Sequence, residues 1–441
     1  MIFNKSVKIK NLLCLISSTT IAQIISVIVS PILTRLYSPE IFGEYSLYLS
    51  IYSILIILFT AGYESAINLP KRKETAHKLI VLCIIISIGC CITSEIIIFI
   101  NNNFFQYNLV NLSEKYIILL PFAALLGSIY KVMNFYYIRV SWFNVLSKIN
   151  ILQALVLAIL NVVFAYIIFN YNGLIISNFL ALFSITIITF IIFKNRTSRN
   201  SLKIKKILFL SKRYKNFPKY SLTSNLFNIA VTSIPVMLFS KFYGTYYLGM
   251  YAIASRCINM PLSVIGSSIS QIFLNDIAKI KSDKVMLKKV TEKYYNYLLY
   301  LNLLFPIIGL IAEPLFGFIF GEKWIFSGKI VKILSPYLSV AFIYSSLSSL
   351  ITIKEVQSLS LKFNMANFFT NIVIIFIFHF SNNSFINLIA CMSLFNFILW
   401  NAFGYFLLNL VDIKFNIFFK NLVIYTIIPF LFCNIMNFVW R

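Results

Sequence analysis

The sequence predicts an all-α integral membrane protein with twelve or thirteen transmembrane helices. Hydrophobic residues make up 60% of the 441 residues and charged residues only 12%, about half of the charged share of soluble domains. A helix needs about 20 apolar residues to cross a bilayer, and uncharged runs of that length recur along the chain. A membrane barrel would show segments of about 10 residues with alternating polarity. The continuous runs therefore indicate helices.

Six spans are predicted before the middle of the chain and six after it. The first run follows three lysines and stays uncharged from Leu12 to Leu33, which is long enough for a retained helix rather than a signal peptide. The first six spans cover residues 12–34, 45–66, 79–100, 116–138, 149–170 and 173–193. The second six cover residues 220–240, 246–274, 294–312, 333–353, 363–380 and 385–411. A last apolar run, 417–440, either forms a thirteenth span or packs along the bundle.

The chain accordingly divides into two six-helix halves joined by a basic linker. The predicted parts are an N-terminal half, a linker, a C-terminal half and an additional C-terminal helix, at residues 1–193, 194–219, 220–411 and 412–441. A shift of 206 residues sets residues 35–45 against 241–251, so that Tyr, Gly and Tyr coincide and a basic residue leads each copy. Two such halves around a central cavity are a recurrent transporter plan. A generic turn between helices is the alternative interpretation of the repeat.

The basic residues predict the orientation, because cytoplasmic loops retain Lys and Arg during insertion. With the N-terminus in the cytoplasm, the inner segments hold 29 of the 38 basic residues and the outer segments hold seven. Ten of the 29 lie in the linker 194–219. The net charge of +25 is then explained by topology and by contact with anionic membrane lipids. No nucleic-acid partner is needed.

The titratable residues form no compact catalytic or metal-binding pattern. The seven cysteines lie in apolar stretches without Cys-x-x-Cys spacing, and only His77 and His379 could join them as ligands. No glycine-rich phosphate loop, short-spaced carboxylate pair or Ser-His-Asp arrangement is present. The sequence therefore predicts a protein that is not an enzyme and needs no metal or cofactor.

Two short motifs resemble a known family. Residues 30–45, SPILTRLYSPEIFGEY, and residues 62–66, GYESA, followed by a basic loop, resemble the N-terminal part of Wzx-type O-antigen and capsular polysaccharide flippases. These polysaccharide transporters belong to the multidrug, oligosaccharidyl-lipid and polysaccharide exporter superfamily. In the second half, residues 251–256, YAIASR, followed by Pro261, resemble the eighth helix of that superfamily, where a basic residue commonly faces the central cavity.

The resemblance implies a transport function. The expected substrate is an oligosaccharide linked to undecaprenyl diphosphate, moved from the cytoplasmic to the periplasmic leaflet of a bacterial inner membrane by alternating access. The expected partners are this glycan, membrane lipids, a polysaccharide polymerase and chain-length proteins. No covalent bond needs to change in such a step.

Charged residues inside spans are candidate site residues, because each costs roughly 2.5–3.5 kcal/mol to insert. Arg256 lies near the middle of its span and is the first candidate for the diphosphate, since guanidinium binds phosphate oxygens in pairs. Lys131 is expected either to line the cavity or to extend toward the headgroups. Arg35 and Lys241 are related by the repeat and lie near the outer interface. Glu64, placed in the second helix, is the coupling candidate, since burial favours the protonated form of a carboxylate.

Two alternative functions are an enzyme and an antiporter. A membrane polysaccharide polymerase or ligase would need a long outer loop, whereas the longest predicted outer loops are residues 101–115 and 313–332. A multidrug or cation antiporter of the same superfamily would favour acidic residues in its cavity, whereas these spans carry the basic residues Lys131 and Arg256. The short loops argue against the enzyme, and the basic residues favour an anionic substrate.

Overall fold

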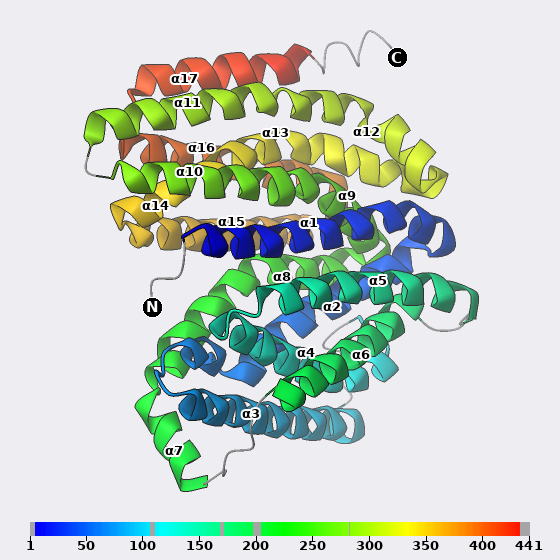
Figure 1. The fold of residues 1–441 in the computed structure, drawn as a ribbon. Helices are drawn as coiled ribbons and strands as arrows, with labels where there is room; N and C mark the ends of the chain where they lie inside the picture. The colour runs from blue at the N-terminus through cyan, green and yellow to red at the C-terminus, as the bar shows by residue number, and fades with distance from the viewer. Residues whose placement is uncertain (1–4, 106–110, 168–171, 197–203, 282, 433–441) are drawn as a thin grey trace. The chain divides into compact units, whose positions relative to one another are not determined.

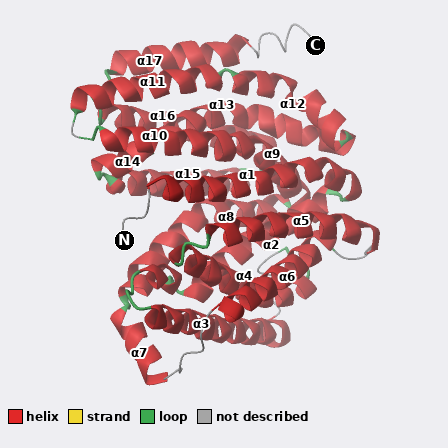
Figure 2. Cartoon of the chain, in the orientation of Figure 1, coloured by secondary structure: helices red, strands yellow, loops and turns green. Residues whose placement is uncertain are grey.

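The computed structural model describes residues 5–105, 111–167, 172–196, 204–281 and 283–432. Every regular element in these ranges is a helix, as Figure 2 shows. Within the described ranges, thirteen helices are long and apolar enough to cross a membrane. This confirms the predicted all-α, multi-pass membrane fold. The thirteenth candidate covers Phe415–Phe432, and the rest of the predicted run to residue 440 lies outside the described residues.

The chain forms two compact units, Met1–Leu248 and Gly249–Arg441, and the border falls within one helix, α9. The functional halves that the repeat suggests, 1–193 and 220–411, stay a prediction.

Among the residues that the structure describes, the first unit contains α1 to α8, three short helical segments and the start of α9. Figure 1 labels the α-helices. The elements are α1 (Lys5–Leu36), α2 (Pro39–Thr60), η1 (Tyr63–Asn68), α3 (Lys73–Ile100), η2 (Asn101–Phe105), α4 (Glu114–Arg139), α5 (Phe143–Ile167), α6 (Gly173–Arg196), α7 (Ile204–Arg213), η3 (Phe217–Leu222), α8 (Thr223–Tyr243) and α9 (Thr245–Pro261).

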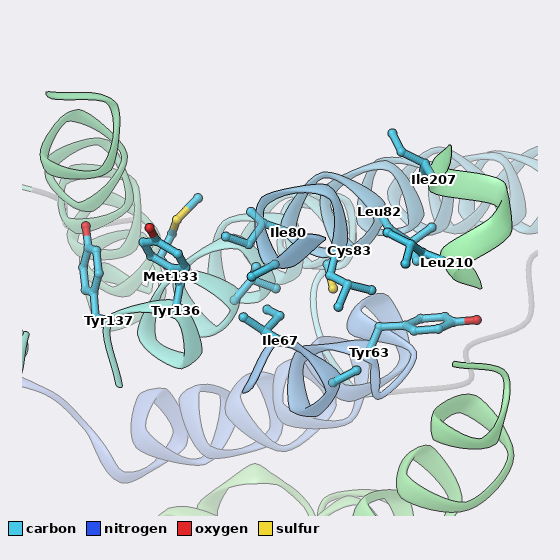
Figure 3. Close-up of a cluster of buried hydrophobic side chains, with 14 of the residues drawn as sticks. Tyr63, Ile67, Ile80, Leu82, Cys83, Met133, Tyr136, Tyr137, Ile207 and Leu210 are labelled. Carbon is cyan, nitrogen blue, oxygen red and sulfur yellow. The ribbon is translucent and has the colours of Figure 1, made fainter. Parts of the chain in front are cut away.

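Packing in the first unit joins helices that are distant in the sequence. Helix α1 packs on α5, and α2 packs on both α4 and α8. A hydrophobic core of the first unit lies between α3, α4, η1 and α7 and extends to α5 and α6, and Figure 3 shows part of it. Apolar side chains from these elements meet there, so the short segments η1 and α7 are held by the same core as the long helices.

The second predicted span is corrected by the structure. Helix α2 ends at Thr60, because Ala61 (φ 48°) and Gly62 (φ 75°) adopt the left-handed conformation that terminates helices. The chain then forms the separate 3-10 turn η1 instead of continuing to residue 66. Glu64 therefore belongs to this turn and not to the second helix.

The linker is also partly structured. Residues 204–213 form the amphipathic helix α7, which packs on α3, and η3 then leads into α8. Residues 197–203 of the linker lie outside the described residues.

The second unit contains the rest of α9 and the remaining helices. These are η4 (Leu262–Gly266), α10 (Ser267–Lys279), α11 (Lys284–Asn302), α12 (Leu304–Phe320), η5 (Glu322–Trp324), α13 (Ile325–Leu347), α14 (Ser349–Lys354), α15 (Gln357–Phe380), α16 (Phe385–Asn409), α17 (Phe415–Leu422) and η6 (Val423–Ile427). Helix α13 is the most buried candidate span and packs on α12 and α16. It forms the centre of this unit.

Candidate functional site

A compact turn at the end of α2 carries the acidic candidate. Glu64 lies in η1 and is fully buried, at 0% exposure. The Tyr63 hydroxyl donates a hydrogen bond to the Ser211 carbonyl of α7 at 3.1 Å. The guanidinium of Arg139, at the end of α4, donates to the carbonyls of Ile67, at 2.9 Å, and of Pro70. The turn is thus fixed by two neighbouring helices, and the position of Glu64 is fixed with it.

Glu64 forms an ion pair with Lys131 of α4. The Lys131 Nζ atom lies 2.8 Å from Glu64 Oε1, and the side chains are 27% and 1% exposed, respectively. Neither carboxylate oxygen accepts a well-aligned hydrogen bond from the described residues. The Lys131 side chain stays 27% exposed while its ammonium group contacts this buried carboxylate, and its place in the cavity or toward the headgroups stays a prediction.

The surroundings of η1 make this charge pair sensitive to any change of charge. The core around η1 is apolar and includes Ile67, Leu79, Ile80, Cys83 and Val132. Figure 3 shows Tyr63 and Ile67 of η1 together with Cys83 of α3 and Leu210 of α7. Coulomb interactions are stronger in such a low-dielectric environment, and an unpaired charge there is costly. Removing Lys131 would therefore leave the Glu64 carboxylate as an unpaired charge in an apolar core.

The two basic residues of the repeat lie at helix ends. Arg35 is exposed in the last turn of α1, and Lys241 is exposed in the last turn of α8. Gly43, in the first copy, packs so closely on the Thr245 backbone that an added Cβ would lie 1.9 Å from the Thr245 carbonyl oxygen. The first copy therefore contacts the beginning of the second copy within the first unit. Neither basic residue is brought to the Glu64–Lys131 pair by a described contact.

Arg256 belongs to the second unit. It is half-buried in α9, about 16 Å along the helix from Thr245, so it lies deep within the candidate span Thr245–Lys279. This span is made of α9, the π-helical η4 and α10, and such π-helical segments are frequent at functional sites.

The second unit also contains a partly open apolar pocket of about 410 Å³. It lies between α13, α16 and the last span, and its polar lining side chains are Ser393 and Thr426. The Ser393 hydroxyl donates to the Ile333 carbonyl at 2.6 Å, so it is already satisfied. The pocket can accept an apolar chain but offers little to a polar ligand.

Two contacts of this site were missed by sequence reasoning. One is the contact of Arg139 with the backbone of η1 and of the loop after it, at Ile67 and Pro70. The pairing of Glu64 with Lys131 was not predicted either. Gly62 carried a usable signal, because glycine after an apolar run often marks a helix end. Among the described residues, no group of three or more His, Cys, Asp or Glu could hold a metal ion.

The fold is that of a class of membrane transporters. The inward-facing structure of a multidrug resistance MATE family transporter of the MOP superfamily has a TM-score of 0.67 and 14% identity, with coverage of 88% of this chain and 95% of that chain. The lipid II flippase MurJ, in an inward closed conformation, has a TM-score of 0.66 and 18% identity, with coverage of 96% and 91%. At these identities the likeness establishes the fold.

The family follows from the sequence. The model of the family described as polysaccharide biosynthesis protein matches residues 32–329, and the chain belongs to this family. The family indicated by residues 30–45 and 62–66 is thereby confirmed.

Two curated relatives match parts of the chain. One is an uncharacterized membrane protein in the cps region of Klebsiella pneumoniae, 27% identical over 164 residues, or 36% of this chain and 32% of the relative. The other is the teichuronic acid biosynthesis protein TuaB of Bacillus subtilis, 27% identical over 128 residues, or 28% of this chain and 26% of the relative. The matches thus span about a third or less of the length of each relative.

Proposed function

We propose that this protein is a flippase that moves an oligosaccharide linked to undecaprenyl diphosphate from the cytoplasmic to the periplasmic leaflet of a bacterial inner membrane. The observation that carries the proposal is the MurJ-like fold over 96% of a chain that belongs to a polysaccharide biosynthesis family. The name of that structural relative describes it as a lipid II flippase. The step changes no covalent bond and thus requires transport rather than enzymatic catalysis.

The proposed substrate consists of an oligosaccharide, a diphosphate and a lipid tail. The chain offers groups for the diphosphate and for the lipid tail. The diphosphate needs a cation inside the membrane, and Arg256 supplies a planar guanidinium deep in its span. The lipid tail needs an apolar surface, and the pocket between α13, α16 and the last span provides one. Arg35 and Lys241, exposed at helix ends, are secondary candidates for contact with the negatively charged substrate.

Glu64 and Lys131 are proposed to couple transport to a proton. Protonation of Glu64 would remove its charge and release Lys131, and η1 joins α3, α4 and α7, so the change would reach three helices. Glu64→Gln imitates the protonated form. In vesicles we expect this variant to flip a fluorescent lipid-linked oligosaccharide at a rate that no longer responds to an imposed pH gradient. Glu74→Gln, at an exposed position of α3, is the control and should keep the response. An unchanged response of Glu64→Gln would exclude this role.

The role of Arg256 is tested by surface glycan per unit of membrane-inserted protein. Arg256→Ala should insert normally and abolish surface polysaccharide, while lipid-linked units accumulate inside the cell. Arg256→Lys should recover part of the activity, because an ammonium keeps the charge but loses the paired hydrogen bonds of guanidinium. Full export by well-expressed Arg256→Ala protein would contradict the role.

The same experiment separates the alternative functions. Loss of a polymerase or ligase would leave unpolymerised or untransferred units on the periplasmic side. Loss of a multidrug antiporter would change drug resistance and leave the glycan intact. The predicted partnership with a polymerase and chain-length proteins can be tested by crosslinking in the native membrane. These proteins should then copurify with the crosslinked flippase.

A further inference from the structure

Helix α7 has two faces of opposite character. Ile207 and Leu210 are 5% exposed and join the core of the first unit. At about 100° per residue, Phe209 lies on the opposite side, between basic residues that are all exposed: Lys206, Lys212 and Arg213. Phe209 itself is 64% exposed. An exposed aromatic side chain thus lies in the middle of a basic surface. We call the surface formed by Lys206, Phe209, Lys212 and Arg213 the α7 basic face.

The charge of the α7 basic face is not neutralised within the described protein. No described carboxylate forms an ion pair with Lys206, Lys212 or Arg213. The sequence contains no acidic residue between Glu114 and Asp276. Three further exposed basic residues precede or begin α3, the helix on which α7 packs: Lys71, Arg72 and Lys73. The surface therefore complements an extended negative charge.

The position of α7 favours a membrane surface as its occupant. Helix α3 begins a candidate span at Lys73, and the span that contains α8 begins at Phe217, directly after α7. Helix α7 thus lies beside the ends of two spans, where headgroups begin. A helix with basic residues around an aromatic side chain suits this environment, since the ring enters the boundary of the acyl chains while the cations contact phosphates.

We propose that the α7 basic face is a docking surface for anionic phospholipid headgroups, with Phe209 inserted between them. Its inner face is fixed on α3, and the Ser211 carbonyl accepts the Tyr63 hydrogen bond. Docking would therefore hold the turn that carries Glu64. The inference concerns lipid recognition and does not depend on the identity of the transported substrate.

The test uses the full-length chain with Phe209→Trp in vesicles of phosphatidylcholine, with or without phosphatidylglycerol. A nitroxide-labelled phosphatidylcholine quenches fluorescence near the headgroups, and the unsubstituted protein supplies the background from its native tryptophans. Quenching of the new tryptophan should increase with phosphatidylglycerol and decrease at high salt. Adding Lys206→Gln, Lys212→Gln and Arg213→Gln should weaken docking roughly 100-fold, because each surface cation is worth about fivefold.

The control removes three exposed lysines from α11 by Lys284→Gln, Lys289→Gln and Lys293→Gln, in the Phe209→Trp background. It lowers the net charge equally and should keep the phosphatidylglycerol response. Hydrogen exchange of α7 in the unsubstituted protein gives a second measurement, and its amides should exchange more slowly when phosphatidylglycerol is present. Equal quenching in both kinds of vesicle would overturn the proposal, as would an equal loss in the α11 control. If the surface instead bound a soluble acidic protein, quenching would be equal in vesicles with and without phosphatidylglycerol.

Discussion

Glu64 and Lys131 form a charge pair in which the two partners differ in solvent access. The carboxylate is fully buried, while the lysine is about one quarter exposed. Removing the lysine leaves a buried charge without its partner, which usually costs about 3–5 kcal/mol. Removing both charges leaves no such penalty. The folded state is therefore destabilised mainly when one charge of the pair is removed and the other stays buried.

This asymmetry predicts the stability of three variants. Lys131→Ala should lower the unfolding free energy by about 3 kcal/mol, whereas Lys131→Met combined with Glu64→Gln should recover most of the loss. The control is Lys332→Ala, which breaks the Glu313–Lys332 pair at 3.6 Å, where the carboxylate is 23% exposed instead of buried, and should cost at most about 1 kcal/mol. Unfolding of the purified protein in detergent measures all three. Wild-type stability of Lys131→Ala would show that the pair is not formed.

At the level of elements, Gly62 follows the left-handed Ala61 at the break between α2 and η1 and is the residue that lies against η3. Gly62 has a φ of 75°, and an added Cβ would lie 3.0 Å from the Leu222 nitrogen and 3.1 Å from the Phe217 oxygen. Both the backbone conformation and the neighbouring η3 therefore disfavour a side chain. The turn that carries Glu64 can approach η3 because Gly62 has no side chain.

Gly62→Ala is accordingly expected to destabilise the protein by about 1–2 kcal/mol, the usual cost of the left-handed conformation for other residues. Gly89→Ala is the matched control, because Gly89 lies within α3 and an added Cβ would meet nothing within 4 Å. That change should be neutral or stabilise the helix by up to about 1 kcal/mol. Thermal unfolding of both variants measures the difference. Equal stability would show that the helix break does not require glycine.

These elements also show how far the sequence could lead. The spans were predictable, because crossing a bilayer requires a length and an apolar composition that can be read directly from the residues. The end of α2 was missed because hydropathy continues through Ala61 while the backbone turns. The partners of Glu64 and of Tyr63 lie far along the chain, at Lys131 and Ser211. Such contacts depend on packing between helices, which a hydropathy pattern does not specify.

At the scale of the whole molecule, the distribution of positive charge predicts the orientation in the membrane. Inner segments hold 29 basic residues and outer segments hold seven when the N-terminus is placed in the cytoplasm. The structure supplies suitable positions for testing this. The exposed Arg72 precedes the candidate span Lys73–Phe104, and the exposed Lys115 lies at the start of the next, Glu114–Arg139. If α3 crosses the membrane, these two positions lie on opposite sides of it.

The orientation is therefore tested with single cysteines at these two positions, in a chain whose seven native cysteines are replaced by serine or alanine. A thiol reagent that cannot cross the inner membrane should label Lys115→Cys in intact cells and leave Arg72→Cys unlabelled. Disruption of the cells should expose both positions to the reagent, which controls for reactivity. The reverse pattern would place the N-terminus in the periplasm, and labelling of both in intact cells would show that α3 does not cross. The predicted pattern would place η1 and the adjoining α7 beside the cytoplasmic leaflet, where anionic lipid would meet the α7 basic face.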